Sequence, residues 1–203
     1  MKIIDVEQGT QEWLDYRKGK ISGTMISALY SKRGNRKIGF YELIAERLAI
    51  DPDDENRMDR GLRLEDEAIE KFTEKTGKKV ERVGICVHDK YPSIINSPDG
   101  LIKDGKFYTE AVEVKCLSSP RHLQALVENK VPDEYEAQKL QYFIVNPKLN
   151  TLYFVFYDDR VRSNPLHIIE IHRKDLNDLP EKFLQFQLEQ LKEVNKIIEE
   201  LAF

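Results

Sequence analysis

Three charged side chains near the middle of the chain have the types and spacing of a metal site that acts on phosphate esters. Glu113 and Lys115 alternate with apolar residues, so on a strand, where side chains change face at every position, both would share one face. Asp99 lies upstream in a Ser-Pro-Asp-Gly segment, and a short hairpin would bring its carboxylate to Glu113. Mg²⁺ prefers such oxygen ligands, and a neighbouring lysine can orient or deprotonate water or stabilise developing phosphorane charge.

Each of these two pieces has a simpler interpretation when it is taken alone. Two alternating charges on a strand are more often a solvated face, and Ser-Pro-Asp-Gly is more often a plain turn. Only the convergence of Asp99 and Glu113, with Lys115 beside them, favours a metal site over these interpretations.

Two expected helices contribute further polar side chains. On the helix over 60–75, Glu65 lies near the centre of the apolar arc, whereas Glu67 lies on the opposite face. A buried carboxylate needs a cation, so Glu65 is expected at the metal or, nearly as readily, in a buried salt bridge. Gln138 and Tyr142 are four residues apart and share a helical face. Gln138 can hydrogen-bond a phosphate, although alone it would be a core-edge amide.

The elements that must position these residues form a mixed pattern. Helical spacing predicts helices over about 11–18, 22–30, 40–50, 60–75, 120–129, 133–145 and 179–202, and apolar, β-branched runs predict strands over 83–88, 93–96, 107–116, 151–157 and 166–171. Asp99-Gly100 and Asp104-Gly105 are turn signals. This order predicts an α/β fold in which a central mixed sheet is flanked by helices, with a long helix at the C-terminus.

Composition limits the class of protein. The 203 residues fit one domain, and 40% hydrophobic with 33% charged residues is typical of a soluble globular protein. Two cysteines, Cys86 and Cys116, make neither a disulfide framework nor a four-cysteine metal site, which predicts a reduced, cytoplasmic protein. No apolar run is long enough for a membrane span, and no secretion signal is expected. The net charge of −4 argues against non-specific coating of nucleic acid but is compatible with an acidic metal site.

These motifs resemble those of the PD-(D/E)xK nuclease superfamily, and within it the lambda exonuclease and YqaJ-like viral recombinase nuclease family. The matching residues stand in the family's order: Trp13, Arg17, Gly19, Ile21 and Ser22; Arg60, Gly61 and Glu65; Ser97 to Gly100; Glu113 to Cys116; Tyr135, Ala137, Gln138, Gln141 and Tyr142. Each motif is weak alone, but five in order are specific, and the likeness covers roughly residues 8–160.

The resemblance implies a fold and a metal site. The fold would be a restriction-endonuclease-like core in a single nuclease domain over 1–203, with the core at about 8–160 and a C-terminal strand and helix at 161–203. Asp99, Glu113 and the Val114 carbonyl would bind Mg²⁺, for which Mn²⁺ would substitute, and Glu65 would assist. Lys115 would act on the attacking water.

The resemblance also implies a site for the 5′-phosphate of the degraded strand. Arg17, Thr24, Ser97 and Gln138 would gather this phosphate, with Thr24 placed by counting from Arg17, and Tyr142 would support the site. An arginine is suited to the task because its planar fork binds phosphate through two hydrogen bonds. Arg33 lies in the basic loop over 31–37, which would either reach the duplex ahead of the cut or remain a solvated loop.

The activity implied is a Mg²⁺-dependent 5′-to-3′ double-stranded DNA exonuclease that leaves 3′ single strands for phage-type homologous recombination. Its partners would be double-stranded DNA ends, a single-strand annealing recombinase and further copies of the chain, as in the trimeric ring of the lambda enzyme, within a bacterial or phage-infected cell. Two alternatives stay open: an endonuclease on the same core, either nicking or restriction-like, and a non-catalytic DNA-end binding protein.

Overall fold

The computed structural model describes residues 10–12, 15, 26–29, 36–48 and 57–201. These residues fall into two compact units. The first unit holds the described residues of Met1–Glu67, with Lys115–Lys130 and Phe156–His167, and the second holds Ala68–Val114, Val131–Val155 and the described residues of Ile168–Phe203. The expected single domain over 1–203 stays a prediction.

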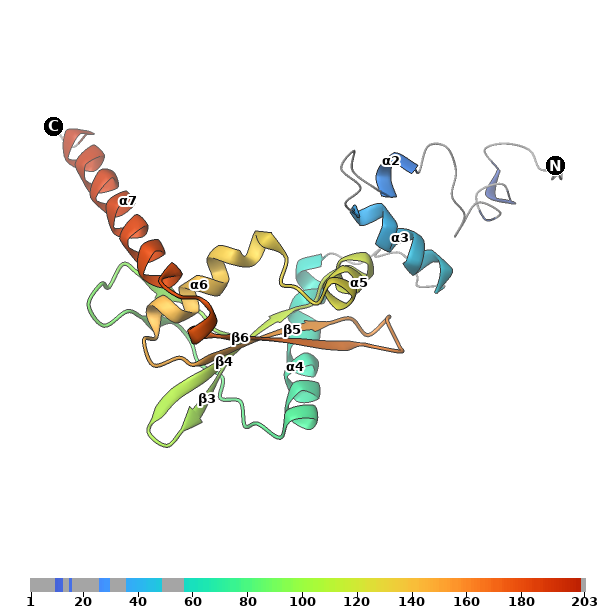
Figure 1. Cartoon of the computed structure of the whole chain (residues 1–203), viewed down its shortest axis with the longest axis horizontal. Helices are drawn as coiled ribbons and strands as arrows, with labels where there is room; N and C mark the ends of the chain where they lie inside the picture. The colour runs from blue at the N-terminus through green and yellow to red at the C-terminus, as the bar shows by residue number, and fades with distance from the viewer. Residues whose placement is uncertain (1–9, 13–14, 16–25, 30–35, 49–56, 202–203) are drawn as a thin grey trace. The chain divides into compact units, whose positions relative to one another are not determined.

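Helices and strands follow the expected mixed order (Figure 1). The α-helices are α2 (Ile26–Leu29), α3 (Ile38–Arg47), α4 (Arg57–Thr76), α5 (Ser119–Glu128), α6 (Glu136–Val145) and α7 (Leu179–Leu201), and the short 3₁₀ helices are η1 (Asp133–Tyr135) and η2 (Arg173–Asp175). The strands are β1 (Cys86–Val87), β2 (Ile95–Asn96), β3 (Gly100–Asp104), β4 (Phe107–Lys115), β5 (Thr151–Tyr157) and β6 (Leu166–His172). In the described part of the chain, no helix is long and apolar enough to cross a membrane.

The strands form a small ribbon and a larger sheet. β1 and β2 pair antiparallel, and the four-stranded mixed sheet has the order β3-β4-β5-β6. β3 and β4 form an antiparallel hairpin in which Gly100 lies opposite Val112. Gly105, at φ 59°, supplies the left-handed conformation of the turn, which glycine adopts at little cost. The expected α/β fold with a central mixed sheet and a long C-terminal helix is confirmed.

Helices cover both faces of the central strand β5, whose residues are all buried. On one face, the Tyr153 ring lies 5.2 Å from that of Phe72 of α4, measured between centroids. On the other face, the Phe154 ring lies 6.0 Å from that of Tyr135, next to α6. Burial from both sides explains why this strand is continuously apolar instead of alternating.

The buried stripe of α4 differs from the one expected. Leu64, Ala68 and Phe72, at intervals of four residues, are buried, whereas Glu65 is only partly buried at the edge of the stripe. Glu67, expected on the outer face, accepts a hydrogen bond of 2.5 Å from the Tyr157 hydroxyl. The expected outward position of Glu67 is therefore wrong, because this side chain is partly buried and hydrogen-bonded, whereas the role of Glu65 stays a prediction.

The strand that carries Asp99 into position also differs from the prediction. The strands expected over 83–88 and 93–96 shorten to β1 and β2, and β3 begins at Gly100, where a turn was expected. A Cβ atom on Gly100 would lie 2.2 Å from Val80 Cγ1. Glycine therefore stands here because another segment approaches closely, and only the Asp104-Gly105 signal marks a turn.

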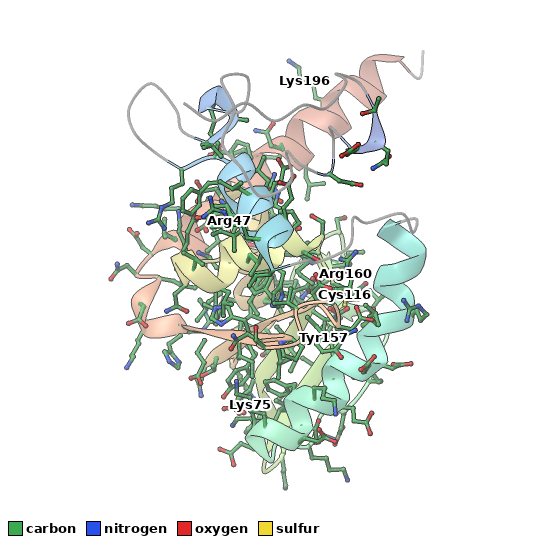
Figure 2. All side chains as sticks on the ribbon, turned by 90° about the vertical axis from the view of Figure 1, so that its right-hand side faces the viewer. Arg47, Lys75, Cys116, Tyr157, Arg160 and Lys196 are labelled. Carbon is green, nitrogen blue, oxygen red and sulfur yellow. The ribbon has the colours of Figure 1, made fainter. Side chains whose placement is uncertain are left out.

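A buried polar cluster anchors the start of α5 in the first unit. The fully buried Asp158 accepts hydrogen bonds from the Ser119 hydroxyl at 2.5 Å and from Arg160 Nε at 2.9 Å. Arg160, Tyr157 and Cys116 lie near one another at this end of β5 (Figure 2). The carboxylate thus ties the chain after β5 to the helix that follows β4.

Candidate active site

The Asp99 carboxylate is fixed against the strand that carries Glu113. The register of the hairpin places Gly100 opposite Val112, so Asp99 lies next to the end of β4. The Val114 N–H donates a hydrogen bond of 2.6 Å to Asp99 Oδ2. On the other side, Arg82 Nη1 donates to the Asp99 backbone carbonyl at 2.8 Å. Asp99 is therefore held beside the peptide bond that joins Glu113 to Val114.

The Glu113 side chain is only 2% exposed, and α6 supplies donors to both of its oxygens. Gln138 Nε2 donates to Glu113 Oε1 at 2.6 Å, and the Tyr142 hydroxyl donates to Oε2. Gln138 and Tyr142 are one helical turn apart, which is why one helix face can reach both oxygens. These two hydrogen bonds fix the orientation of the carboxylate.

Both carboxylates influence the pKa of the Tyr142 hydroxyl. Tyr142 is 2% exposed, and burial is the first cause that raises the pKa of its hydroxyl far above the ordinary value. The negative charge of Glu113, its hydrogen bond and the negative charge of Asp99 raise the pKa further. One hydroxyl thus lies within the fields of two carboxylates, so the structure brings Asp99 and Glu113 together.

The other expected metal-site residues lie on β4 and α4. Val114, buried, follows Glu113 on β4, and Lys115 is the partly buried last residue of this strand. Lys115 and Glu65 belong to the first unit. Within the part of the chain that the structure describes, no three histidine, cysteine or acidic side chains gather as they would around a metal ion. The acidic pair that the structure assembles is Asp99 with Glu113.

The expected phosphate ligands are only partly described. Arg17, Thr24 and Arg33 lie outside the described residues. Ser97 is exposed, two positions before Asp99, and the Gln138 amide is directed at Glu113. The phosphate site stays a prediction.

Two contacts at this site have no local signal in the sequence. Arg82 reaches the Asp99 carbonyl from 17 residues upstream. Gln141 Nε2 donates to the Ile95 carbonyl at 2.9 Å and ties α6 to β2. The spacing of Gln138 and Tyr142 does indicate a shared face, but it does not reveal that this face meets Glu113.

Comparison with known proteins gives a family and a fold. Residues 12–148 match the family model of the YqaJ-like viral recombinase domain. The chain is also similar to two crystal structures, one of LHK-Exo in complex with dAMP and one of an alkaline exonuclease, LHK-Exo, from Laribacter hongkongensis. In both comparisons the identity is 27%, the TM-score is 0.62, and the match covers 95% of this chain and 98% of the other. No curated protein matches the chain.

Proposed function

We infer that this chain, which belongs to the family of YqaJ-like viral recombinase domains, is a DNA exonuclease of the lambda exonuclease type that hydrolyses phosphodiester bonds. The family match spans more than half of the chain, and the similarity to an alkaline exonuclease extends over nearly all of it. The observation that carries the inference is that the Asp99 carboxylate accepts the N–H of Val114, the residue directly after the buried Glu113 carboxylate.

The acidic pair fits a hard divalent cation. Mg²⁺ is commonly held by one or two carboxylates, with waters and substrate phosphates completing its octahedron, and Mn²⁺ accepts the same ligands. Asp99 and Glu113 would hold the ion, with the Val114 carbonyl as a further oxygen ligand and Glu65 assisting. A carboxylate has about four lone-pair sites, so hydrogen bonds to Glu113 are compatible with coordination.

Each side chain then has a distinct task in hydrolysis. The bound cation supplies Lewis-acid polarisation of the phosphodiester. Lys115, two positions beyond Glu113 on β4, orients or deprotonates the attacking water and stabilises charge on the phosphorane oxygens. Gln138 and Tyr142 hold Glu113 in position through their hydrogen bonds.

The finer activity that we propose is 5′-to-3′ digestion of double-stranded DNA ends, leaving 3′ single strands for recombination. Arg17, Thr24, Ser97 and Gln138 would bind the 5′-phosphate, with Arg33 near the duplex. The Gln138 amide carries two N–H donors, so it can serve Glu113 and a phosphate together. We also propose that the protein is a cytoplasmic homo-oligomer, such as a trimeric ring. It would work with a single-strand annealing recombinase.

A digest of labelled linear duplex tests this function. The expected result is release of nucleotides from 5′-phosphorylated ends in Mg²⁺ or Mn²⁺, slower digestion of 5′-hydroxyl ends, and DNA binding without cleavage in Ca²⁺. Equal digestion of both kinds of end would contradict the phosphate site. Cleavage of closed circular DNA would instead establish the endonuclease alternative.

Matched lysine variants separate catalysis from binding. Lys115→Ala should abolish cleavage while largely sparing DNA binding in Ca²⁺. Lys174→Ala, which removes an exposed lysine of η2, should cleave like the wild type. Wild-type protein that binds ends but never cleaves in Mg²⁺ or Mn²⁺ would establish the non-catalytic alternative.

A further inference from the structure

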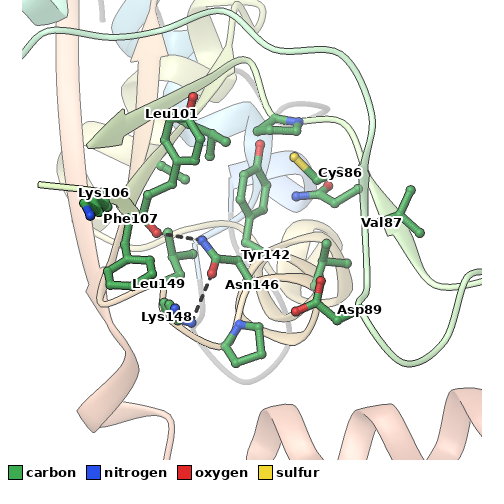
Figure 3. A pocket seen from close by; sticks show the side chains of 16 residues that line it. Cys86, Val87, Asp89, Leu101, Lys106, Phe107, Tyr142, Asn146, Lys148 and Leu149 are labelled. Carbon is green, nitrogen blue, oxygen red and sulfur yellow. Dashed lines mark hydrogen bonds between the residues drawn. The ribbon is translucent and has the colours of Figure 1, made fainter. Parts of the chain in front are cut away.

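A pocket of about 420 Å³ lies in the second unit (Figure 3). Its lining comes from three places: the β1–β2 ribbon, the β3–β4 hairpin, and the end of α6 with the segment after it. The volume lies within the range of about 300–1,000 Å³ that is usual for ligand pockets. The pocket is therefore large enough to receive a small organic group.

The pocket and the proposed active site share walls. Figure 3 shows the Tyr142 ring among the lining side chains, and its hydroxyl binds Glu113. Pro98, which precedes Asp99, lines the pocket too, as does Ala111, two residues before Glu113 on β4. Two strand residues span roughly 7 Å. The Ala111 and Tyr142 end of the pocket is thus near the acidic pair, whereas Phe107, six strand residues before Glu113, is roughly 20 Å from it.

One end of the pocket combines an exposed aromatic ring with positive charge. Phe107 is 50% exposed, and Lys148 Nζ lies 3.2 Å from the centroid of its ring. Lys106, which precedes Phe107, lies beside it in Figure 3. Counting only the described residues, neither lysine forms a salt bridge, whereas Lys103 on the same hairpin pairs with Glu81 at 2.8 Å.

The polar groups near this end are ordered. The Asn146 side chain donates to the Tyr108 carbonyl at 2.8 Å, and its oxygen accepts the Lys148 N–H at 3.0 Å. These two bonds, dashed in Figure 3, fix the segment that carries Lys148 against the hairpin that carries Phe107. The aromatic and cationic groups are thus held together before any ligand binds.

We propose that this pocket binds an unpaired nucleotide of DNA, with its base among the aromatic side chains and its backbone phosphate at Lys106 and Lys148. Aromatic rings beside lysines suit single-stranded DNA, because bases stack on the rings and phosphates meet the ammonium groups. Only one acidic residue, Asp89, lines the pocket against these two lysines. The proposal rests on the proposed function, since it makes the pocket a subsite for frayed DNA a few nucleotides from the cut.

The test measures binding of a fluorescent single-stranded oligothymidylate to the full chain in Ca²⁺, at several salt concentrations. Phe107→Ala should weaken binding about 5- to 150-fold, the range found when a stacking aromatic side chain is removed. Lys148→Ala should lower the slope of log affinity against log salt by about 0.7, the loss of one phosphate contact. Phe186→Ala, which removes a 52% exposed ring of α7, should bind like the wild type.

Photocrosslinking locates the bound base. An oligonucleotide carrying 5-iodouracil should crosslink to Phe107, Tyr108 or Tyr142, and Phe107→Ala should reduce the yield. Wild-type affinity and an unchanged salt slope in both pocket variants would overturn the proposal and leave the pocket to a protein partner. Crosslinks outside the lining residues would overturn it as well.

Duplex digestion by the same proteins separates the two hypotheses. If the wild type cleaves in Mg²⁺ but Phe107→Ala and Lys148→Ala bind single strands normally, only the pocket assignment fails. If the wild type does not cleave, the proposed function fails, and the Ca²⁺ binding data still decide whether the pocket takes a nucleotide. Lys148 is exposed, so its variant tests the pocket even if Phe107→Ala folds poorly.

Discussion

Two hydrogen bonds to one buried carboxylate dominate the site at the residue scale. Glu113 is nearly inaccessible, yet it is held by an amide and a hydroxyl that approach its two oxygens separately. Partners of this kind orient a metal-binding side chain and tune its basicity, and their loss typically reduces metal affinity or activity by about 10–100-fold.

Removal of the Tyr142 hydroxyl should therefore weaken the metal site without removing the ring. We expect Tyr142→Phe to lower Mg²⁺ affinity or activity by about 10–100-fold, measured as cleavage rate against Mg²⁺ concentration. Tyr153→Phe is the matched control, because it deletes a hydroxyl that binds Glu110 elsewhere in the same unit. An unchanged Mg²⁺ curve for Tyr142→Phe would mean that Glu113 needs no such support.

The Asp158 cluster should make stability depend on pH in acid. Burial raises the pKa of this carboxyl, but hydrogen bonds from Arg160 and Ser119 outweigh burial and leave the pKa below its ordinary value. Because the pKa of Asp158 is lower in the folded state, its ionised carboxylate stabilises the fold at any pH above the unfolded-state pKa of about 3.9. This stabilisation is lost as the pH falls through the lowered pKa of the folded state.

We expect Asp158→Asn to have a lower free energy of unfolding than the wild type at neutral pH. Below about pH 4 the difference in free energy of unfolding between the two proteins should become smaller. Urea unfolding across this pH range measures both quantities. A constant gap from neutral to acid conditions would show that Asp158 does not contribute through its charge.

At the element scale, the sequence predicts long elements well and short ones poorly. β5 has the expected bounds because its run of apolar and β-branched residues is continuous, and α7 begins at the expected residue because its apolar stripe repeats over several turns. The sequence does not predict β3, because a glycine at position 100 is compatible either with a turn or with the close approach of another segment. A single sequence does not distinguish these two possibilities.

Substitution of Gly100 should test the close approach directly. A methyl group at this position would meet Val80 Cγ1, so Gly100→Ala should lower the free energy of unfolding by about 1–3 kcal/mol, the usual cost of overpacking. Adding Val80→Ala should recover part of that loss, and a urea double-mutant cycle measures the coupling. Simple additivity of the two substitutions would show that Gly100 is needed for another reason.

At the scale of the whole molecule, the candidate site depends on contacts between distant segments. The alternation of Glu113 and Lys115 was readable from the sequence, as was the shared face of Gln138 and Tyr142. Their meeting at Glu113 was not, because it depends on how α6 packs on the sheet, which local spacing does not encode. For the same reason the edge position of Glu65 appears only in the folded helix.

Metal binding should stabilise the whole fold, because two carboxylates lie close together in the folded state alone. A ligand at 100 times its dissociation constant adds about 2.7 kcal/mol, which would raise the thermal midpoint by about 5–10 °C for a chain of this size. We expect this shift with Mg²⁺ in the wild type and in Asp104→Asn, an exposed hairpin variant, but not in Asp99→Asn or Glu113→Gln. Equal shifts in all four proteins would place the ion elsewhere.

The raised pKa of Tyr142 has a consequence for work under alkaline conditions. A free tyrosine loses its proton near pH 10, but this hydroxyl keeps its proton well beyond that point because burial and two anions oppose ionisation. The support that it gives to Glu113 is complete below pH 10 and would be lost only as the pH rises through the raised value. Basic solutions that ionise surface phenols therefore leave this internal donor intact.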